Sequence, residues 1–236
     1  MRALGFIDPA GLVAIATFAE SQWRIGRTVQ LIAPDSEQLA RYLTRMHLGE
    51  VIKELDGWHN LPHVKEQDQE GRLLELQKFY GEGAPPQLAA LVEQQLGDTD
   101  AAAAIHNGIC EIGQNVPQHS SNDAGYIAAV STPSTGQVHF AVGDAGVGLL
   151  EPLIERGYGS SLEVMKALFA HRGITRTGTV GRGNGVHRTK ETVTDSGGTV
   201  YLASGKSALV AVRRGQREIA GLHEVPGTLL QASMPC

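Results

Sequence analysis

The chain has few cysteines, no long hydrophobic run and no excess of basic residues, and each of these absences excludes a class of protein. Only Cys110 and Cys236 occur in 236 residues. Such sparse cysteine argues against a disulfide framework or a zinc cluster and indicates a reducing, cytoplasmic environment. No apolar run reaches the roughly 18 residues that a membrane-spanning helix requires, and Asp8 comes too early for a signal peptide. The formal net charge of -5 disfavours nucleic acid as a partner.

Several common catalytic signatures are incomplete as well. Gly205-Lys206-Ser207 resembles the end of a P-loop, but Val200 occupies the place of the earlier glycine that this motif requires. The stretch Gly181 to Val186 departs from G-x-G-x-x-G at its last position, which disfavours a dinucleotide-binding site. Histidines such as His59 and His63 show no metal-ligand spacing, and no serine completes the G-x-S-x-G of a hydrolase.

The apolar periodicity divides the chain into a small N-terminal part and a larger C-terminal part. Residues 1–55 have the pattern of a β-α-β-α module, in which Asp8 caps a helix that Pro9 begins. Residues 56–85 are polar and rich in turn residues, which predicts a linker or a peripheral segment. Residues 86–236 carry enough alternating and helical segments for a larger α/β unit. The expected strands are 3–7, 28–33, 125–130, 137–142, 199–202, 208–213 and 227–233, and the expected helices begin at about 9, 36, 86, 100, 162 and 186.

Three short segments carry the chemistry, and the first of them lies on a predicted helix. Residues four apart advance about 40° around a helix, so Glu111, Asn115 and His119 form one slowly drifting stripe. This stripe lies beside the apolar one that includes Ile105 and Ile109. A carboxylate can activate a water or a hydroxyl group, and an asparagine oxygen is a ligand suited to Mg²⁺.

The second segment follows an apolar strand, and the third precedes a helix. Asp144 ends the predicted strand, where its carboxylate can accept the exocyclic amine of adenine, and Gly146 and Gly148 allow the backbone to turn over a ligand. Gly181-Arg182-Gly183-Asn184-Gly185 leads into a helix whose free N–H groups form an anion site suited to phosphates. Many of the 29 glycines fall between residues 136 and 205, which predicts loops that approach a ligand closely.

In this order and spacing the segments resemble the GHKL superfamily, which includes DNA gyrase, the large heat-shock chaperone, mismatch-repair MutL and sensor histidine kinases. Glu111-x-x-x-Asn115-x-x-x-His119 resembles the N-box of that family. Asp144-x-Gly146-x-Gly148 resembles its first glycine box, and Gly181-x-Gly183-x-Gly185 resembles its second. The ending from Gly227-Thr228 to Pro235 resembles the final strand of the family. The resemblance covers residues 86–235.

The resemblance implies a Bergerat ATP-binding fold, which is a two-layer α/β sandwich with helices on one face of a mixed sheet, and it implies ATP and Mg²⁺ as cofactors. Glu111 would orient or deprotonate the nucleophile, and Asn115 would bind Mg²⁺. Asp144 would hold the adenine amine, with help from Thr228 through water. The lid and the phosphate cradle would be formed by His119, Gly146, Gly148, Gly181, Arg182, Gly183, Asn184 and Gly185.

Two residues depart from the family pattern. Pro117 removes a helical hydrogen bond just after Asn115, which predicts that the helix bends or ends there. Val186 stands where a leucine follows the second glycine box, which predicts a different packing of the lid. Among family members the resemblance is nearest in kind to the small anti-sigma-factor serine kinases, which carry a glutamate at the place of Glu111. Residues 1–55 resemble a STAS-like module, the kind of partner on which those kinases act.

Functions of different classes stay open at this point. The first is a cytoplasmic, Mg²⁺-dependent ATP-binding regulatory protein that hydrolyses ATP or transfers its γ-phosphate to a protein partner. The alternative is a nucleotide-gated protein-binding module with little or no catalysis, which Pro117 and the lack of a recognisable phosphoacceptor favour. A third is a scaffold that has lost its nucleotide. The expected partner is a regulatory protein or a second copy of the chain, whereas membrane and nucleic acid are disfavoured.

Overall fold

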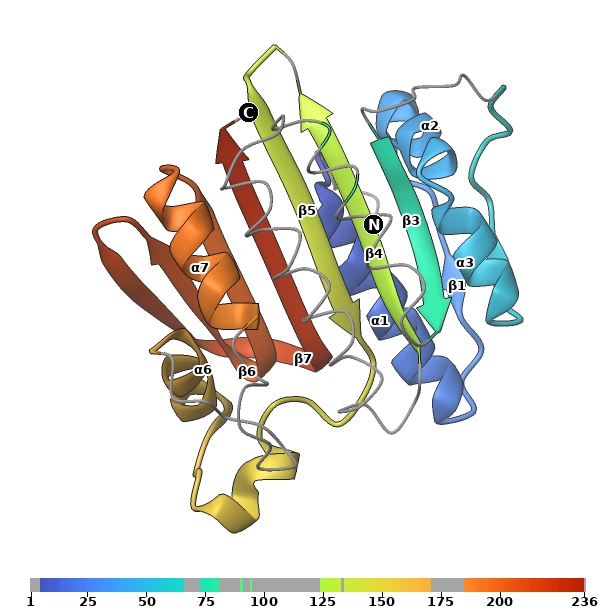
Figure 1. Ribbon diagram of the computed structural model, residues 1–236. Helices are drawn as coiled ribbons and strands as arrows, with labels where there is room; N and C mark the ends of the chain where they lie inside the picture. The colour runs from blue at the N-terminus through green and yellow to red at the C-terminus, as the bar shows by residue number, and fades with distance from the viewer. Residues whose placement is uncertain are drawn as a thin grey trace.

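The centre of the molecule is a five-stranded antiparallel sheet, shown in Figure 1 as part of a computed structural model that describes residues 5–65, 73–80, 90, 94, 124–132, 134–170 and 185–235. The strands lie in the order β3-β4-β5-β7-β6, and each neighbouring pair is antiparallel. Because β7 lies between β5 and β6, the last strand of the chain is an interior strand of the sheet. The strands are β3 (Leu73–Tyr80), β4 (Ala124–Thr132), β5 (Gln137–Asp144), β6 (Thr199–Val212) and β7 (Gly215–Pro235).

The central strands are buried on both faces. Along β4 the burial is uninterrupted from Ala124 to Ala129. Side chains alternate between the two faces of a strand, so Phe140 of β5 packs on one face while Tyr126 of β4 packs on the other. A strand that is apolar at successive positions needs a cover on each side, which explains why this sheet carries two layers of helices.

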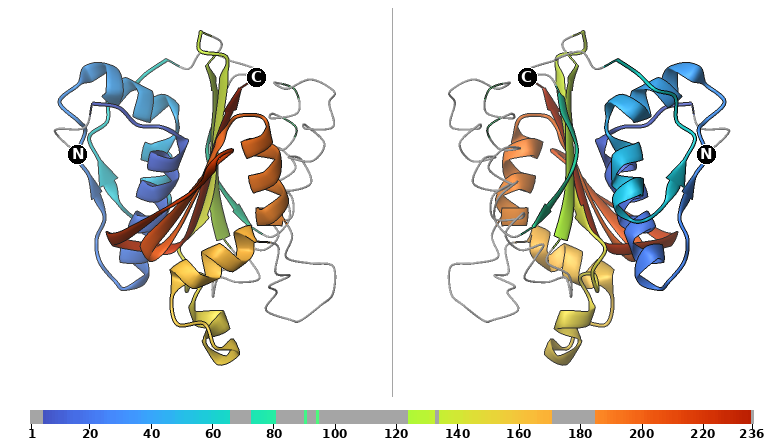
Figure 2. Two further views of the ribbon diagram at one scale, coloured as in Figure 1. Left: turned by 90° about the vertical axis from the view of Figure 1, so that its left-hand side faces the viewer. Right: turned by 90° about the vertical axis from the view of Figure 1, so that its right-hand side faces the viewer.

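Helices cover both faces of the sheet, as the edge-on views in Figure 2 show. The helices on one face are α1 (Pro9–Arg24), α2 (Glu37–Arg45) and α3 (Leu48–Glu54). The helices on the other are α6 (Ser161–Phe169) and α7 (Gly185–Asp195), and the 3-10 helix η1 (Glu151–Arg156) precedes α6 in the chain. The two faces are called the α1 face and the α7 face below.

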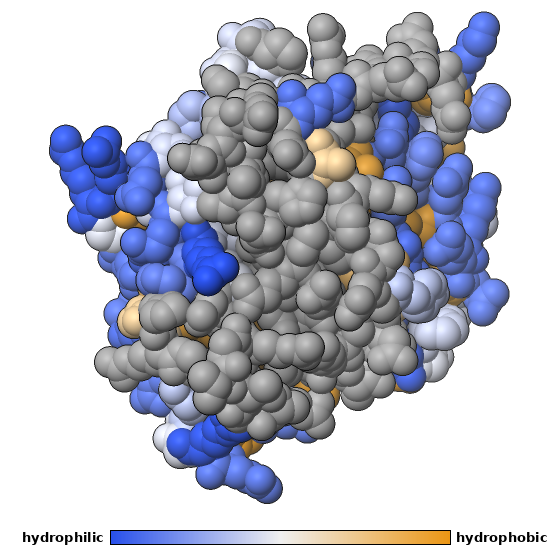
Figure 3. Space-filling view, in the orientation of Figure 1, coloured by the Kyte–Doolittle hydropathy of each residue, from blue (hydrophilic) through white to orange (hydrophobic). Residues whose placement is uncertain are grey.

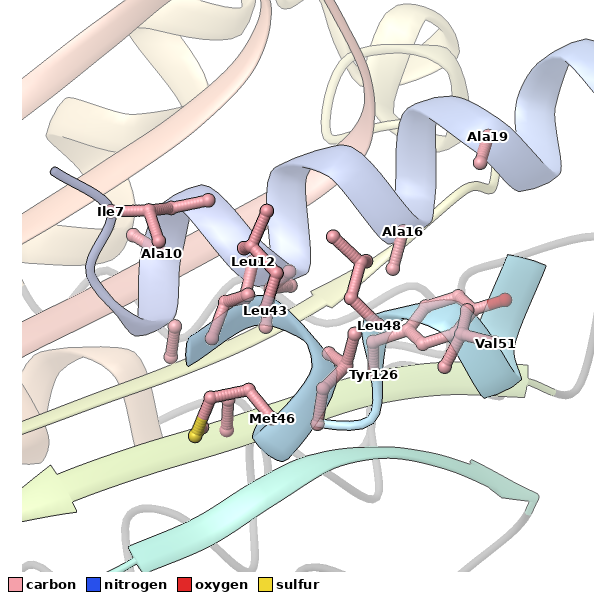
Figure 4. Close-up of a cluster of buried hydrophobic side chains, with 14 of the residues drawn as sticks. Ile7, Ala10, Leu12, Ala16, Ala19, Leu43, Met46, Leu48, Val51 and Tyr126 are labelled. Atoms are coloured by element: carbon pink, nitrogen blue, oxygen red, sulfur yellow. The ribbon is translucent and has the colours of Figure 1, made fainter. Parts of the chain in front are cut away.

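The α1 face is held together by one long amphipathic helix. Asp8 caps α1 by accepting a hydrogen bond from the Gly11 N–H at 2.8 Å, and proline begins the helix. Leu12 and Ala16 are fully buried and lie among residues from α2, α3 and the sheet, including Tyr126 (Figure 4). The helix ends at Arg24, and Gly26 follows in a left-handed conformation with φ 78°.

A small parallel ribbon completes this layer. β1 (Gln30–Leu31) pairs in parallel with β2 (Trp58–His59), and the Asn60 side chain accepts a hydrogen bond from the Ala33 N–H at 2.6 Å. The strand expected at 28–33 is therefore shorter than predicted, and residues 5–7, expected within a strand, have no regular structure. In the orientation of Figure 1, the coloured part of the surface is mainly hydrophilic, with a few apolar side chains among the polar ones (Figure 3).

The α/β class expected from the sequence is confirmed. In the described residues each neighbouring pair of the five-stranded sheet is antiparallel. Helices lie on both faces because α1, which belongs to the expected N-terminal module, packs its apolar side against β4, β5 and β7. The two-layer Bergerat sandwich with a mixed sheet, expected for residues 86–236, stays a prediction. The domain boundaries predicted at residues 55 and 85 stay predictions.

The segment 56–85, expected as a linker or peripheral structure, contributes both β2 and the edge strand β3. Leu74 and Leu76 of β3 are buried. The helices expected from about 86 and 100 lie outside the described residues, except that positions 90 and 94 are helical. None of the helices in the described part of the chain has the length and apolar character needed to cross a membrane.

Candidate functional site

Asp144 stands at the end of β5 and is buried in the interior, with 5% of its surface exposed. Strand alternation places its side chain on the α7 face, together with Phe140 and Val142, which belong to the core of that face. Thr228 of β7 lies on the same face by the same alternation from Leu230. Because Gly143 pairs with Leu229 across the two strands, Asp144 and Thr228 become neighbours.

The Asp144 carboxyl is held by backbone donors. It accepts a hydrogen bond from the Gly146 N–H at 2.7 Å, and the backbone N–H of Thr228 also favours its charged form. Burial nevertheless raises the pKa of Asp144 to about 7, because the loss of hydration outweighs these two backbone N–H groups and the charge of Arg24, which act in the opposite direction. The group therefore titrates near neutrality. A carboxyl that is buried at a loop and strongly perturbed is a candidate ligand-binding group.

The loop after Asp144 is fixed to the neighbouring strands by one serine. The Ser204 hydroxyl of β6 accepts a hydrogen bond from the Leu149 N–H at 3.0 Å and donates one to the Gly227 carbonyl at 2.7 Å. Gly148 has φ 78°, and a Cβ on it would lie 2.7 Å from the Ser204 hydroxyl. The loop thus requires glycine at position 148, both for its backbone conformation and for this close contact.

Gly227 makes an even closer approach on the other side of Asp144. It has φ 60°, and a Cβ there would lie 2.2 Å from the Asp144 carbonyl oxygen and 2.6 Å from the Asp144 Oδ1 atom. Only a residue without a side chain permits β7 to bring Thr228 beside the carboxyl. Gly227 and Ser204 were not among the predicted site residues. The Gly-Thr pair at 227–228 was the available signal for the first, and no local signal marks the second.

The structure brings together four of the residues predicted from the sequence: Asp144, Gly146, Gly148 and Thr228. Gly185 begins α7 and is buried, on the same face of the sheet. The remaining predicted residues lie outside the described part of the chain: Glu111, Asn115, His119, Gly181, Arg182, Gly183 and Asn184. Their positions relative to Asp144 stay predictions.

No metal centre is found in the part of the chain that the structure describes, since no three His, Cys, Asp or Glu side chains come close enough to hold an ion. The Mg²⁺ ligand implied by the resemblance, Asn115, is not in that part. What the described residues do offer is a buried hydrogen-bond acceptor. Asp144 supplies it beside a loop and a strand whose glycines leave room for close approach.

A cleft of about 730 Å³ separates the loop at 145–148 from the C-terminal end of α1. The Asp144 side chain does not line it. Its walls carry apolar side chains that are largely solvent-exposed, namely Phe18, Ile25 and Ile154, with exposed fractions of 55%, 62% and 56%. Exposed apolar side chains gathered at one cleft are typical of a surface that contacts another molecule.

A second polar cluster is buried between α1 and the sheet. Glu20 of α1 is 1% exposed and accepts a hydrogen bond from the Tyr126 hydroxyl at 2.5 Å. Its carboxylate also pairs with Arg24 at 2.9 Å and with Lys78 of β3 at 3.4 Å. Burial and the hydrogen bond to Glu20 raise the pKa of Tyr126 well above its usual range, so this hydroxyl stays a donor. The cluster ties α1 to β3 and β4.

Comparison of the chain with protein-family models and with curated proteins gave no match.

Proposed function

We propose that the chain is an Mg²⁺-dependent ATP-binding regulatory protein of the histidine-kinase-like ATPase type, which hydrolyses ATP or transfers its γ-phosphate to a protein partner. The observation that carries this proposal is the placement of Asp144. The carboxyl is buried at the end of β5, anchored by the Gly146 and Thr228 N–H groups, and followed by a loop that requires glycine. The cysteine content supports a cytoplasmic location for such a protein.

The strand order supports the proposal independently of the loop. The resemblance assigns Asp144 and Thr228 to the same adenine base, although the two residues are far apart in the sequence. Insertion of β7 between β5 and β6 makes them neighbours on one face of the sheet. A chance match of short motifs would not require the two strands to pair in this register.

The geometry supports recognition of a base by Asp144. An ionised carboxylate has two acceptor oxygens, and backbone N–H groups of Gly146 and Thr228 use part of that capacity. The remaining lone pairs can accept the exocyclic amine of adenine. In the proposed reaction Glu111 orients the nucleophile and Asn115 holds Mg²⁺, which neutralises phosphate charge. Both roles rest on the resemblance alone.

The alternative is a nucleotide-gated binding module, and the cleft beside the loop favours it. Phe18, Ile25 and Ile154 are exposed along a cleft that shares the loop at 145–148 with the proposed nucleotide site. A partner seated there would contact the loop that follows the base-binding carboxyl. Nucleotide and partner would then influence each other's affinity without any chemical step.

The fate of the γ-phosphate distinguishes these functions. The purified chain is incubated with Mg²⁺ and ATP labelled on the γ-phosphate, beside the Glu111→Ala variant. We expect label to be released as phosphate or transferred to protein by the wild type, and neither to occur in the variant, which still binds ATP. Bound ATP with no label movement in either protein would favour the nucleotide-gated module. Absence of ATP binding to the wild type would contradict both.

Base binding should depend on pH because Asp144 must be ionised to accept an amine. Adenosine is the probe, since it has no phosphate to titrate. Its affinity is expected to fall roughly five- to tenfold for each pH unit below 7. Below that pH, Asp144 should release a proton to the buffer when adenosine binds. Calorimetry in buffers of different ionisation enthalpy measures this proton. A pH-independent affinity, or no proton release at pH 6, would contradict the role of Asp144.

The stability of the protein without adenosine should change with pH in the opposite direction to its affinity for adenosine. The folded pKa of Asp144 is raised, so its contribution to stability is fully present below the unfolded value and is lost as pH rises through about 7. Adenosine should therefore stabilise the fold more at pH 8 than at pH 6. The thermal midpoint with and without adenosine at the two pH values measures the difference.

A further inference from the structure

A second cavity lies at the opposite end of the sheet from the loop at 145–148, on the α1 face. Its volume is about 490 Å³, within the usual range for small-molecule sites. The N-terminal segment before α1, the start of α2 and three strands of the sheet form its walls. The lining residues are Gly5, Phe6, Ile7, Asp8, Ser36, Gln38, Leu39, Tyr42, Val130, Thr132, His139, Gln231 and Ser233.

The sheet side of this cavity carries several polar side chains. His139 of β5 lies between Val130 of β4 and Ser233 of β7 in the register of the sheet. Thr132 and Gln231 lie next to them on the same face. Farther along these strands the same face is apolar and covered by α1. A row of hydroxyl, imidazole and amide groups therefore lines a hollow where α1 no longer covers the sheet.

Most of these polar groups have unused hydrogen-bonding capacity. Among the described residues, the hydroxyls of Tyr42, Thr132 and Ser233 make no side-chain hydrogen bond. The Gln231 amide donates to Asp8 Oδ2 at 2.8 Å, and Asp8 Oδ1 accepts from the Gly11 N–H at 2.8 Å. The carboxylate is thus fixed in position by one bond to each oxygen, with further lone pairs available to a ligand.

Among the described residues that line the cavity, Asp8 is the only carboxylate and none is a lysine or an arginine. Asp8 also forms no ion pair with another described residue. Burial and the charge of Asp8 raise the pKa of Tyr42 to about 12, so its hydroxyl faces the cavity as a neutral donor and acceptor. A fixed, unpaired carboxylate in a partly enclosed site selects a cationic ligand.

The remaining lining is apolar and aromatic. Ile7 and Leu39 line the cavity and are buried, whereas Phe6 lines it and is 79% exposed. Together with the Tyr42 ring they offer contact to a small apolar body and to a cation above an aromatic face. We propose that this cavity binds a small organic monocation, an amine carried on an apolar or aromatic body, with Asp8 as its counter-ion.

Benzylamine is the probe, and benzyl alcohol and benzoate are its neutral and anionic counterparts. Titrations of the full chain are followed by amide chemical shifts at about pH 8. We expect benzylamine to bind with a dissociation constant of about a millimolar or tighter, at least about tenfold more tightly than either counterpart. Shifts should be confined to the lining residues and should persist in the presence of saturating ATP.

The variant Asp8→Asn tests the counter-ion without removing the helix cap, because asparagine caps helices as well as aspartate does. It should weaken the binding of benzylamine at least about tenfold. Asp35→Asn makes the same change at an exposed residue that does not line the cavity, and it should leave the affinity for benzylamine unchanged. Equal binding of the alcohol or of benzoate, no binding of the amine, or an unchanged affinity in folded Asp8→Asn would each overturn the proposal. Loss of ATP binding would leave it standing, since the two sites lie at opposite ends of the sheet.

Discussion

Replacement of Asp144 by asparagine is expected to weaken ATP binding by roughly 30- to 100-fold, equivalent to about 2–3 kcal/mol. An asparagine has one acceptor oxygen, and the N–H groups of Gly146 and Thr228 will orient that oxygen toward themselves. The amide NH₂ then faces the adenine amine, donor against donor. The loss therefore includes both the missing hydrogen bond and an unsatisfied buried group. Calorimetric titration with Mg²⁺-ATP measures it.

Two controls distinguish a loss of base recognition in Asp144→Asn from a loss of folding. The wild type should prefer ATP over GTP, because the guanine O6 would face carboxylate lone pairs, and folded Asp144→Asn should lose this preference. Asp195→Asn makes the same change on an exposed carboxylate at the end of α7 and should bind ATP normally. Unchanged ATP affinity in Asp144→Asn would mean that this carboxyl does not bind the base.

Replacement of Glu20 by leucine is expected to destabilise the fold by about 3–5 kcal/mol, the usual cost of removing one partner from a buried ion pair. The substitution leaves the Tyr126 hydroxyl without its acceptor and leaves Lys78, which is 13% exposed, without its buried counter-ion. Arg24 loses its ion-pair partner as well. Chemical denaturation followed by circular dichroism measures the free energy of unfolding.

The chain contains a close control for this experiment. Glu37 and Arg41 of α2 form the same i, i+4 ion pair at 2.8 Å, but both side chains are mostly exposed. Glu37→Leu should cost less than about 1 kcal/mol. Adding Lys78→Met to Glu20→Leu should restore part of the stability, because an apolar pair can replace a buried ionic one. Equal costs for the two glutamates would show that the buried cluster has no special role.

The elements that could be predicted are those with local signals. Asp8 and Pro9 mark the start of α1, and the alternation after Gly136 marks β5. The break expected between strands near Gly205 is instead an irregularity inside one long strand, β6, because Gly205 with φ 60° bends the strand without ending its pairing. β3 was missed because Gln77 and Lys78 interrupt its alternation and because it lies in a polar segment rich in turn residues.

The contacts of the candidate site also differ in whether a local sequence signal predicts them. The contact between Asp144 and Gly146 spans two residues, so the sequence motif itself describes it. The proximity of Thr228 was expected only from the resemblance, and it depends on the pairing of β5 with β7. Ser204 and Glu20 could not be found from sequence because Gly227 and Tyr126, with which they form hydrogen bonds, lie on other elements, 23 and 106 residues away. A buried glutamate on a helix resembles any surface glutamate until its neighbours are known.

The position of α1 has a consequence for how this chain is made. The hydrogen bond between Gln231 and Asp8 joins residues 223 positions apart, and α1 contacts β4, β5 and β7. α1 is synthesised long before β7, an interior strand on which it packs. Part of its apolar side, with Leu12, Val13 and Ala16, therefore has no native cover until β7 has been made. Contacts of such long sequence separation slow folding, so α1 is expected to complete its packing only after β7 is synthesised and to offer chaperones a binding surface until then.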